Sequence, residues 1–269
     1  MLGRAAAREG LVVTLTGAGI SAESGIPTFR GPEGHWTVGS RNYRPMELAT
    51  RRAFAEAPDH VWGWYLHRRA ACLAARPNAA HEALASLDAR LGDGHLLVTQ
   101  NVDGLHLRAG HPPERAFQIH GNLGLRRCSA DCTAELLPLP ESLGPTWERG
   151  RLPTADETQT LACPRCGAPG RPHVLWFDES YDEPRFRFRS TLAAADRARL
   201  LLVIGTSGAT NLPTQIVERV AARRVPVLVV DTEPTPFASL ALAAGGRFEQ
   251  GRATERVPPL AGAIASALA

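Results

Sequence analysis

The chain has 269 residues, a formal net charge of +3 and a hydrophobic fraction of 44%. This length suits one large domain, or one and a half, and the composition is typical of a globular protein with a substantial core. The small charge does not demand a nucleic-acid partner. No apolar run reaches the roughly 18–20 residues of a membrane span, so a membrane protein is not expected.

The N-terminal residues are expected to enter a strand directly, without a signal peptide. The apolar run Leu11–Leu15 predicts that strand, and Gly17, Gly19 and Ala22 after it fit the G-x-G-x-x-G/A turn of a dinucleotide site. In this interpretation Gly17 allows the tight turn, Gly19 lets the backbone approach a pyrophosphate and Ala22 lets the next helix pack closely. Ser21 and the helix N–H groups would face the anion. A plain strand-to-loop turn is the alternative.

The short helix ends almost at once, and Phe29 and Arg30 lead into a Gly-rich loop, Gly31–Gly34. A short helix followed by such a loop predicts a lid over the cofactor.

The next segment, residues 37–77, is expected to be helical, over Pro45–Phe54 and His60–Ala75. Tyr65 and Arg68 are three residues apart, so they share one helix face and could together grip a carboxylate. The alternative is an amphipathic helix with the tyrosine half-buried and the arginine in water.

Polar residues follow the next two predicted strands. A helix is expected to begin at Asn78, with His81 as a helix-start histidine. The strand predicted after it, His95–Thr99, ends in the polar residues Gln100, Asn101 and Asp103. Open α/β sheets place ligands at such strand ends, although Asn and Asp also form turns.

The strand Ala116–Ile119 ends in His120. A lone histidine is usually structural, but this one shares the inferred edge of the sheet with Asn101 and Asp103. Because imidazole titrates near neutrality, His120 could act as a general base.

Two close cysteine pairs interrupt this pattern: Cys128, Cys132, Cys163 and Cys166. With a cytoplasmic location expected, disulfides are disfavoured, and the spacing predicts a tetrahedral Cys₄ zinc ribbon with no open position for catalysis. The Pro-rich residues between the pairs have a poor core and need a metal to fold. Cys72 is expected to be a core residue.

The α/β pattern resumes with the strands Leu200–Ile204, Val225–Val230 and Arg247–Phe248, and a helix over Pro213–Arg223. Asp231 after the second of these strands would suit an adenosine ribose. The fold class predicted is therefore α/β: a Rossmann-like parallel sheet with helices on both faces, plus a small zinc-ribbon and helical domain. The large domain would comprise residues 1–36, 78–125 and 172–269, and the small domain the inserts 37–77 and 126–171.

The motifs together resemble the sirtuins, which are NAD-dependent protein lysine deacylases. From Gly17 to Ala253 the chain carries, in family order, GAGISAESGIPTFRGPEGHW, TQNVDGLH, IHG, the two cysteine pairs, HVLWFDE, GTSG and VDTEP. The resemblance implies NAD as co-substrate, one structural Zn²⁺ and a cleft for an acylated-lysine peptide. The chain is expected to be a monomer.

The resemblance assigns His120 as general base, with Asn101 and Asp103 orienting the nicotinamide end and a water. It implies NAD contacts at Gly17, Ala18, Gly19, Ser21, Ala22, Thr28, Phe29, Arg30, Trp36, Gln100, Asn101, Asp103, His120, Gly205, Thr206, Ser207, Asp231, Thr232, Glu233 and Ala253. It implies peptide or acyl contacts at Tyr65, Arg68, Val174, Trp176, Phe177, Asp178 and Glu179.

The family mechanism consists of attack by the acyl oxygen on the nicotinamide ribose, release of nicotinamide and proton removal by His120, giving O-acyl-ADP-ribose. Tyr65 and Arg68 are similar to the Tyr-x-x-Arg pair of class III sirtuins, which remove succinyl and malonyl groups, and the small Ala49 fits their wider acyl pocket. We therefore expect a preference for acidic acyl groups, with acetyl also possible.

Some positions depart from the family. Asp178 replaces a glycine and would add a carboxylate at the peptide cleft, Asp231 replaces a common Asn, and Ala253 a common Cys. The run 208–213 is also atypical.

Two alternative functions remain: an ADP-ribosyltransferase or NAD hydrolase on the same fold, and a module that binds acyl-lysine without turnover.

Overall fold

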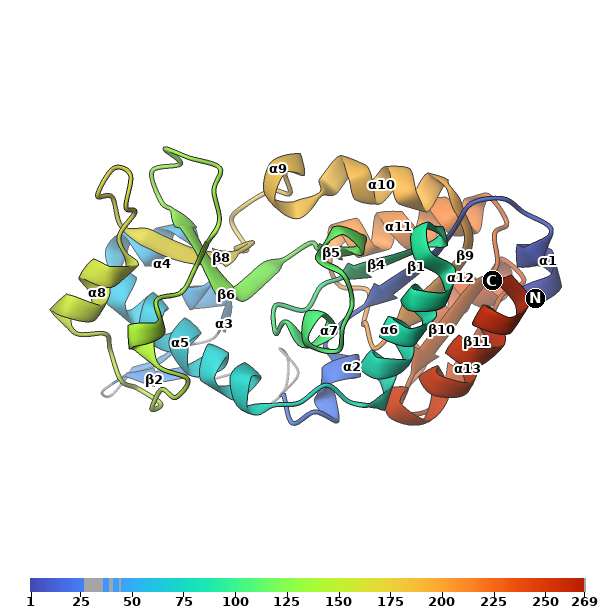
Figure 1. The fold of residues 1–269 in the computed structure, drawn as a ribbon, viewed down its shortest axis with the longest axis horizontal. Helices are drawn as coiled ribbons and strands as arrows, with labels where there is room; N and C mark the ends of the chain where they lie inside the picture. Colours follow the sequence, from blue (N-terminus) through green and yellow to red (C-terminus); the bar gives the residue numbers. More distant parts are fainter. Residues whose placement is uncertain (27–35, 39–40, 44, 269) are drawn as a thin grey trace.

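The computed structural model describes residues 1–26, 36–38, 41–43 and 45–268 (Figure 1). The predictions for Thr28, Phe29, Arg30 and the Gly31–Gly34 loop lie outside the described residues. Of Trp36 only the backbone is described, in strand β2 (Trp36–Val38), which pairs with β3 (Arg41–Tyr43).

The large domain is built on one sheet of six strands in the order β11-β10-β9-β1-β4-β5, all paired in parallel. Their bounds are β1 Leu11–Thr16, β4 His95–Thr99, β5 Ala116–Gln118, β9 Ala198–Ile204, β10 Val227–Asp231 and β11 Arg247–Gln250. The predicted parallel sheet is confirmed. The strand order reverses between β1 and β9, and such a switch point is where open α/β sheets bind ligands.

Helices cover both faces of this sheet (Figure 1). Strand β9 shows why: Leu201 and Val203 pack against one layer of helices, and Leu200 and Leu202 against the other, because successive side chains point to opposite faces. The first layer comprises α10 (Phe188–Asp196), α11 (Asn211–Ala222) and α12 (Pro236–Ala243). The second comprises α1 (Leu2–Ala6), α6 (Ala79–Leu91) and α13 (Ala253–Leu268).

The small domain has its own core, rich in tryptophan. It contains α3 (Pro45–Leu48), α4 (Arg51–Glu56), α5 (Pro58–Ala74) and α8 (Ala155–Leu161), with the antiparallel strands β6 (Gly121–Cys128), β7 (Leu137–Pro138) and β8 (Gly170–Val174). The expected divisions at 125/126 and 171/172 therefore fall inside β6 and β8. The other helices within the described residues are α2 (Gly19–Ala22), α7 (Leu105–Arg108), α9 (Glu183–Phe186) and 3₁₀ turns at Gly92–Gly94, Pro113–Arg115 and Glu141–Leu143.

The helix expected over Pro45–Phe54 is two helices, because Thr50 caps the second one. Its hydroxyl oxygen accepts a hydrogen bond from the N–H of Ala53 at 3.0 Å, which requires an extended backbone at Thr50. No helix among the described residues is both long enough and apolar enough to cross a membrane.

His81 is a helix-start histidine, as predicted. Asn78 caps α6, and the His81 ring and the Asn78 backbone complete a reciprocal capping box. The side chain is fully buried, and burial lowers its pKa to about 4. Burial likewise lowers the pKa of His111 and of His173 to about 4.

These buried histidines predict acid-sensitive folding. The folded pKa values lie below the ordinary 6.5, so the unfolded chain binds more protons below that value. Their stabilising contribution is present above pH 6.5 and is lost as the pH falls toward 4. We expect each histidine to cost about 1–2 kcal/mol of unfolding free energy between pH 7 and pH 5, measured by urea unfolding at both values.

The matched variant is His173→Phe. The His173 ring stacks on Phe186 at 5.5 Å and its Nδ1 has no hydrogen-bond partner, so phenylalanine retains the stack and removes the titration. In this variant, the loss of unfolding free energy between pH 7 and pH 5 should be smaller than in the wild type by about 1–2 kcal/mol. An unchanged loss would contradict this account of His173.

Candidate active site

The site lies at the carboxyl edge of the sheet, where the loops after β1 and β9 touch. The N–H of Gly19 donates to the carbonyl of Gly205 at 2.9 Å. A Cβ atom on Gly19 would stand 2.6 Å from the Gly205 Cα, and one on Gly17 would stand 2.6 Å from the Gly205 oxygen. The contact between the two loops therefore requires glycine at 17 and 19, a reason that differs from the expected approach of a pyrophosphate.

Two details of this turn differ from the expected picture. Ala22 is exposed, and the residue of α2 that is buried in the sheet's core is Ile20. The hydroxyl of Ser21 is buried and donates to the Asp103 carboxylate at 2.8 Å, so within the protein it is already engaged.

Asn101 and Asp103 are brought together by Ser21, as the strand-end argument predicts. The Asn101 amide nitrogen lies 3.1 Å from both the Gly17 carbonyl and the Ser21 hydroxyl. This leaves the amide oxygen as the Asn101 atom that can accept from a ligand. Asp103 accepts from the N–H of Leu105 at 2.8 Å, and burial raises the pKa of its carboxyl.

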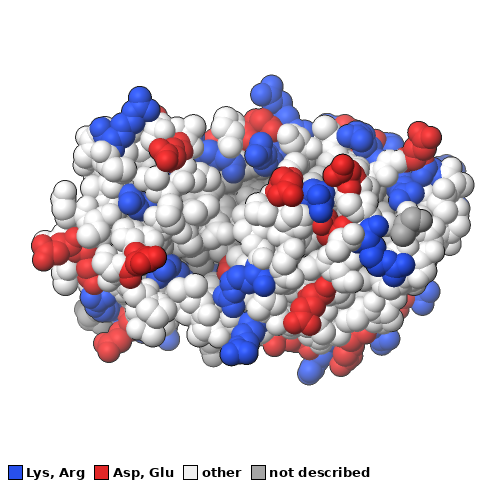
Figure 2. Space-filling model, in the orientation of Figure 1, with Lys and Arg blue, Asp and Glu red and all other residues white. Residues whose placement is uncertain are grey.

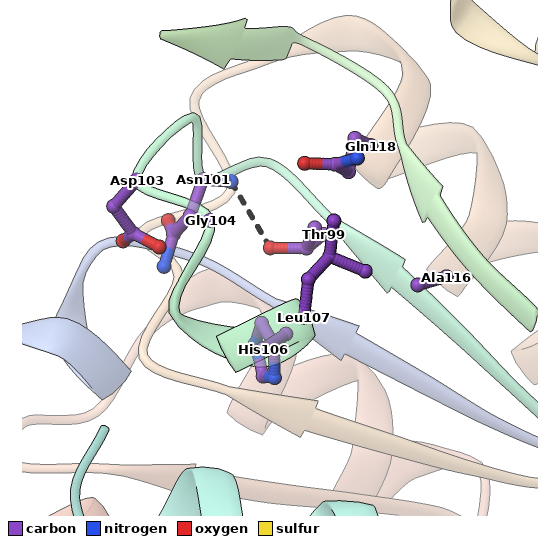
Figure 3. Close-up of a pocket in the computed structure, with 8 residues that line it drawn as sticks. All are labelled: Thr99, Asn101, Asp103, Gly104, His106, Leu107, Ala116 and Gln118. Atoms are coloured by element: carbon purple, nitrogen blue, oxygen red, sulfur yellow. Dashed lines mark hydrogen bonds between the residues drawn. The ribbon is translucent and has the colours of Figure 1, made fainter. Parts of the chain in front are cut away.

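Figure 3 shows the pocket beneath this loop. Asn101 and Asp103 come from the loop after β4, His106 and Leu107 from α7, and Gln118 from β5. The N–H of Asn101 donates to the Thr99 hydroxyl oxygen at 3.1 Å. The loop is thus held by its own strand as well as by Ser21.

Gln100 links two strand ends. Its side-chain nitrogen donates to the Thr206 hydroxyl oxygen at 2.8 Å, and its side-chain oxygen accepts from the Thr210 hydroxyl at 2.9 Å. Thr206 is buried whereas Ser207 is exposed. Gln100 therefore positions the GTSG loop against the Asn101 loop.

The ribose-binding candidates lie at the next strand end. Asp231 ends β10, and its carboxylate accepts from the N–H of Thr232 at 2.8 Å. Thr232 and Glu233 are exposed, while Ala253 is buried at the start of α13. Glu23 accepts from the N–H of Thr254 at 3.1 Å, so a carboxylate from the protein itself occupies that helix terminus.

His120 follows β5 and has two ring contacts. Nδ1 lies 3.0 Å from the carbonyl oxygen of Gln100, and Nε2 lies 2.7 Å from the hydroxyl of Tyr181. Burial lowers the pKa of His120 to about 4, and the Gln100 carbonyl opposes that shift. The imidazole is therefore neutral at pH 7 and able to accept a proton. Tyr181 was not expected from the sequence.

The substrate-strand candidates lie between the two domains. Val174 and Trp176 are buried, and Phe177 is 54% exposed with its N–H bonded to the Ala49 carbonyl at 3.0 Å. Asp178 has a different use from the one expected at the family's glycine position. Its carboxylate accepts from the N–H groups of Arg51 and Arg52 at 2.8 and 3.3 Å and so binds the N-terminus of α4.

The Glu179 carboxylate is held inside the protein. It accepts from Arg171 at 2.5 and 2.9 Å, from Arg127 at 3.2 Å and from the N–H of Trp176 at 3.0 Å. Burial raises its pKa, but these partners, Arg171 foremost, outweigh burial and the pKa is lowered. The side chain thus fixes the loop that carries Trp176 and Phe177.

Tyr65 and Arg68 lie on α5 near this loop. The Tyr65 hydroxyl oxygen accepts from the Trp176 indole N–H at 3.0 Å, and the Arg68 guanidinium lies 5.3 Å from the centre of the Trp64 ring. Burial raises the pKa of Asp103, and the charge of Arg68 is among those that oppose the rise. The charge of Arg68 therefore acts on the Asp103 loop.

Four cysteines form a metal site in the small domain, as predicted. The Sγ atoms of Cys128, Cys132, Cys163 and Cys166 lie within 4.8 Å of one another, with separations of 3.6 Å for Cys128–Cys166 and 3.5 Å for Cys132–Cys163. Zn–S bonds of about 2.3 Å in a tetrahedron require sulfurs about 3.8 Å apart. The donor set and spacing therefore fit one structural Zn²⁺. Cys72 is buried, as expected for the core.

On the face drawn in Figure 2, the surface is hollowed between the small domain and the large domain. The strand-end loops, His120 and the Trp176 loop all lie where the two domains meet, since β6 and β8 lead from one domain into the other. This is the position expected for a site that holds a dinucleotide and a peptide together.

Comparison with known proteins agrees with this geometry. A model of the Sir2 family matches residues 17–211. An NAD-dependent protein deacylase of Thermus thermophilus is 42% identical over 235 residues, 86% of this chain and 82% of its own. NAD-dependent protein deacylase 1 of Pseudomonas aeruginosa is 42% identical over 230 residues, 84% of this chain and 83% of its own.

Solved structures show the same fold. The crystal structure of a Sir2 homolog in complex with NAD has a TM-score of 0.78 at 34% identity, covering 100% of this chain and 94% of its own. A Sir2 structure with a p53 peptide and NAD⁺ has a TM-score of 0.74 at 25% identity, covering 96% and 95%. The family predicted from the motifs is confirmed: the chain belongs to the Sir2 family, the sirtuins, whose relatives named above are NAD-dependent protein deacylases.

Proposed function

We propose that this protein removes acyl groups from protein lysine side chains with NAD as co-substrate, and that it favours acidic acyl groups such as succinyl and malonyl. The observation that carries the acyl preference is the placement of Tyr65 and Arg68. Their helix contacts the Trp176 loop, and the charge of Arg68 acts on Asp103 beside the strand-end site.

The residues at the strand ends fit the cofactor that the family implies. The glycine contact at 17, 19 and 205 shapes two adjacent backbone loops, and Asn101 keeps an amide oxygen available as an acceptor. The phosphate-side candidates are Ala18, Ser207 and the rest of the GAG and GTSG loops, and the ribose-side candidates are Asp231, Thr232 and Glu233. NAD bound here would supply the ribose that receives the acyl group.

His120 is the proposed general base. Its pKa of about 4 keeps the ring neutral at physiological pH, and its Nδ1 contact with a backbone carbonyl holds the ring in one orientation. Asn101 and Asp103, fixed by Ser21, would orient the nicotinamide end and a water. Val174, Trp176 and Phe177 would contact the peptide, with Asp178 and Glu179 fixing the loop that bears them.

The pairing of a buried tyrosine with an arginine on one helix supports the proposal of an acidic acyl group. A carboxylate entering this part of the small domain loses water, and it needs a compensating cation and hydroxyl donor. The Arg68 fork can supply two N–H donors and the Tyr65 phenol a third. An acetyl group has no charge to compensate, so these contacts distinguish the two substrates.

Arg68→Met should separate the two activities. We expect kcat/KM for a succinyl-lysine peptide to fall about 10- to 100-fold, because a hydrogen-bonded charge pair is lost, while kcat/KM for the matched acetyl-lysine peptide changes by less than about threefold. Steady-state assays with saturating NAD measure both.

The matched control is Arg69→Met on the same helix. The Arg69 guanidinium donates to the Gly144 carbonyl at 2.7 Å in the small domain, so its removal should not distinguish succinyl from acetyl peptides. Equal losses on both peptides in the Arg68 variant would defeat the proposed preference.

The reaction type is tested by its products. Incubation with NAD and an acyl-peptide should give nicotinamide and O-acyl-ADP-ribose, detected by mass spectrometry. An NAD hydrolase would instead give ADP-ribose without peptide, and an ADP-ribosyltransferase would give a modified protein.

The role of His120 is tested by His120→Asn, which retains an N–H donor near Gln100 but removes Nε2. We expect it to lower kcat about 10²- to 10⁴-fold. ADP-ribose formed at an undiminished rate would contradict deacylation.

A further inference from the structure

The hydrogen bonds of His120 determine where its ring proton lies. A backbone carbonyl can only accept, so the contact between Nδ1 and the Gln100 oxygen at 3.0 Å places the proton on Nδ1. Nε2 of the neutral ring is then an acceptor with one lone pair. The Tyr181 hydroxyl, 2.7 Å from Nε2, is therefore the donor.

Tyr181 reaches His120 from a separate part of the chain. It lies in the segment between β8 and α9, sixty-one positions beyond the histidine. The centres of the His120 and Tyr181 rings lie 5.8 Å apart. The Tyr181 ring also stacks on Phe188 of α10, with 6.2 Å between ring centres and 20° between ring planes. Burial raises the pKa of Tyr181, so the hydroxyl retains its proton at physiological pH.

This contact uses the same lone pair that a general base needs. With Nδ1 committed to Gln100, a substrate hydroxyl can give its proton to His120 only at Nε2. That hydroxyl and the Tyr181 hydroxyl cannot both donate to one lone pair. The two hydrogen bonds are alternatives, one belonging to the substrate-free protein and the other to the complex.

We propose that Tyr181 is a positioning residue that holds His120 in the Nδ1–H tautomer and occupies its proton-accepting nitrogen until a ribose hydroxyl replaces it. The inference rests on the proposed role of His120 as general base. In the free protein the Tyr181 hydroxyl donates to the lone pair of Nε2 and so fixes the direction of the ring. On binding, one O–H donor replaces another at Nε2, so this nitrogen stays paired, while the Tyr181 hydroxyl gives up its hydrogen bond to His120.

The test uses Tyr181→Phe, which keeps the ring and its stack on Phe188 and removes only the hydroxyl. The full chain is labelled with ¹⁵N-histidine, and the His120 ring nitrogens are assigned by comparison with His120→Asn. At pH 7.5 the wild type should show a protonated Nδ1 and a hydrogen-bonded, unprotonated Nε2. In the variant, the Nε2 resonance should move downfield, toward that of a nitrogen without a donor.

The matched control is Tyr65→Phe. It also removes a buried phenol hydroxyl, but that hydroxyl contacts Trp176 rather than His120, so the His120 nitrogens should be unaffected. ADP-ribose, added without any acyl-peptide, should bring Nε2 of the Tyr181 variant back to a hydrogen-bonded position. Identical His120 spectra in wild type and Tyr181→Phe would overturn the proposal, whatever the acyl preference proves to be.

Steady-state kinetics show whether Tyr181 only occupies Nε2 of His120, as a placeholder for the ribose hydroxyl, or itself transfers the proton. Because the variant has no hydrogen bond to give up on binding, the KM for NAD should fall about 2- to 10-fold, and kcat should fall by less than about tenfold. A fall in kcat of about 100-fold or more would show that Tyr181 itself passes the proton, and the placeholder role would be wrong.

Discussion

The close approach of two backbone loops organises this protein. The loops after β1 and β9 meet at the point where strand order reverses, and the Gly19 N–H bonds to the Gly205 carbonyl there. No side chain fits between them, since any Cβ on Gly17 or Gly19 would overlap Gly205. Ser21, one turn beyond, is thereby placed beside Asn101 and Asp103. The position of the Asn101 loop therefore depends on a contact made entirely by backbone atoms.

The polar groups around that contact are paired with one another before any ligand arrives. Ser21 binds Asp103, the Asn101 amide nitrogen lies beside Gly17, and Gln100 connects Thr206 to Thr210. Burying such groups costs free energy unless they are hydrogen-bonded. Pairing them fixes the direction of the Asn101 oxygen, and the bonds to Gln100 and Tyr181 fix the direction of the His120 ring. This is preorganisation, and it lowers the cost of binding.

The sheet could be predicted from the sequence because its signals are local. Runs such as Leu11–Leu15 and His95–Thr99 are apolar and β-branched, and the polar residues after them mark the ligand edge. The Cys₄ metal site can also be predicted from the sequence, because the spacing of the two cysteine pairs is a local signal. The break in the helix at Thr50 was missed because it depends on a cap, and the pairing of β6 with β8 because it depends on tertiary context.

The site residues were predicted less evenly. Asn101, Asp103 and His120 do share one edge, but Tyr181 has no local signal: only the folded chain brings it to His120. Asp178 looked like a feature of the peptide cleft, and the structure shows it bound to the N-terminus of α4. A carboxylate near a helix start in space, though far from it in sequence, cannot be recognised from spacing.

The hydrogen bonds to the Glu179 carboxylate connect the cysteine ribbon to the Trp176 loop. Arg127 precedes the first cysteine of the metal cluster, and Arg171 is the second residue of β8, the strand that returns from the cluster. Both arginines bond the carboxylate that fixes the Trp176 loop. Displacement of either arginine would leave this buried anion with one fewer cation to compensate it. We therefore expect the ribbon to hold the Trp176 loop in place through these two arginines, although among the described residues no cysteine of the ribbon bonds to that loop.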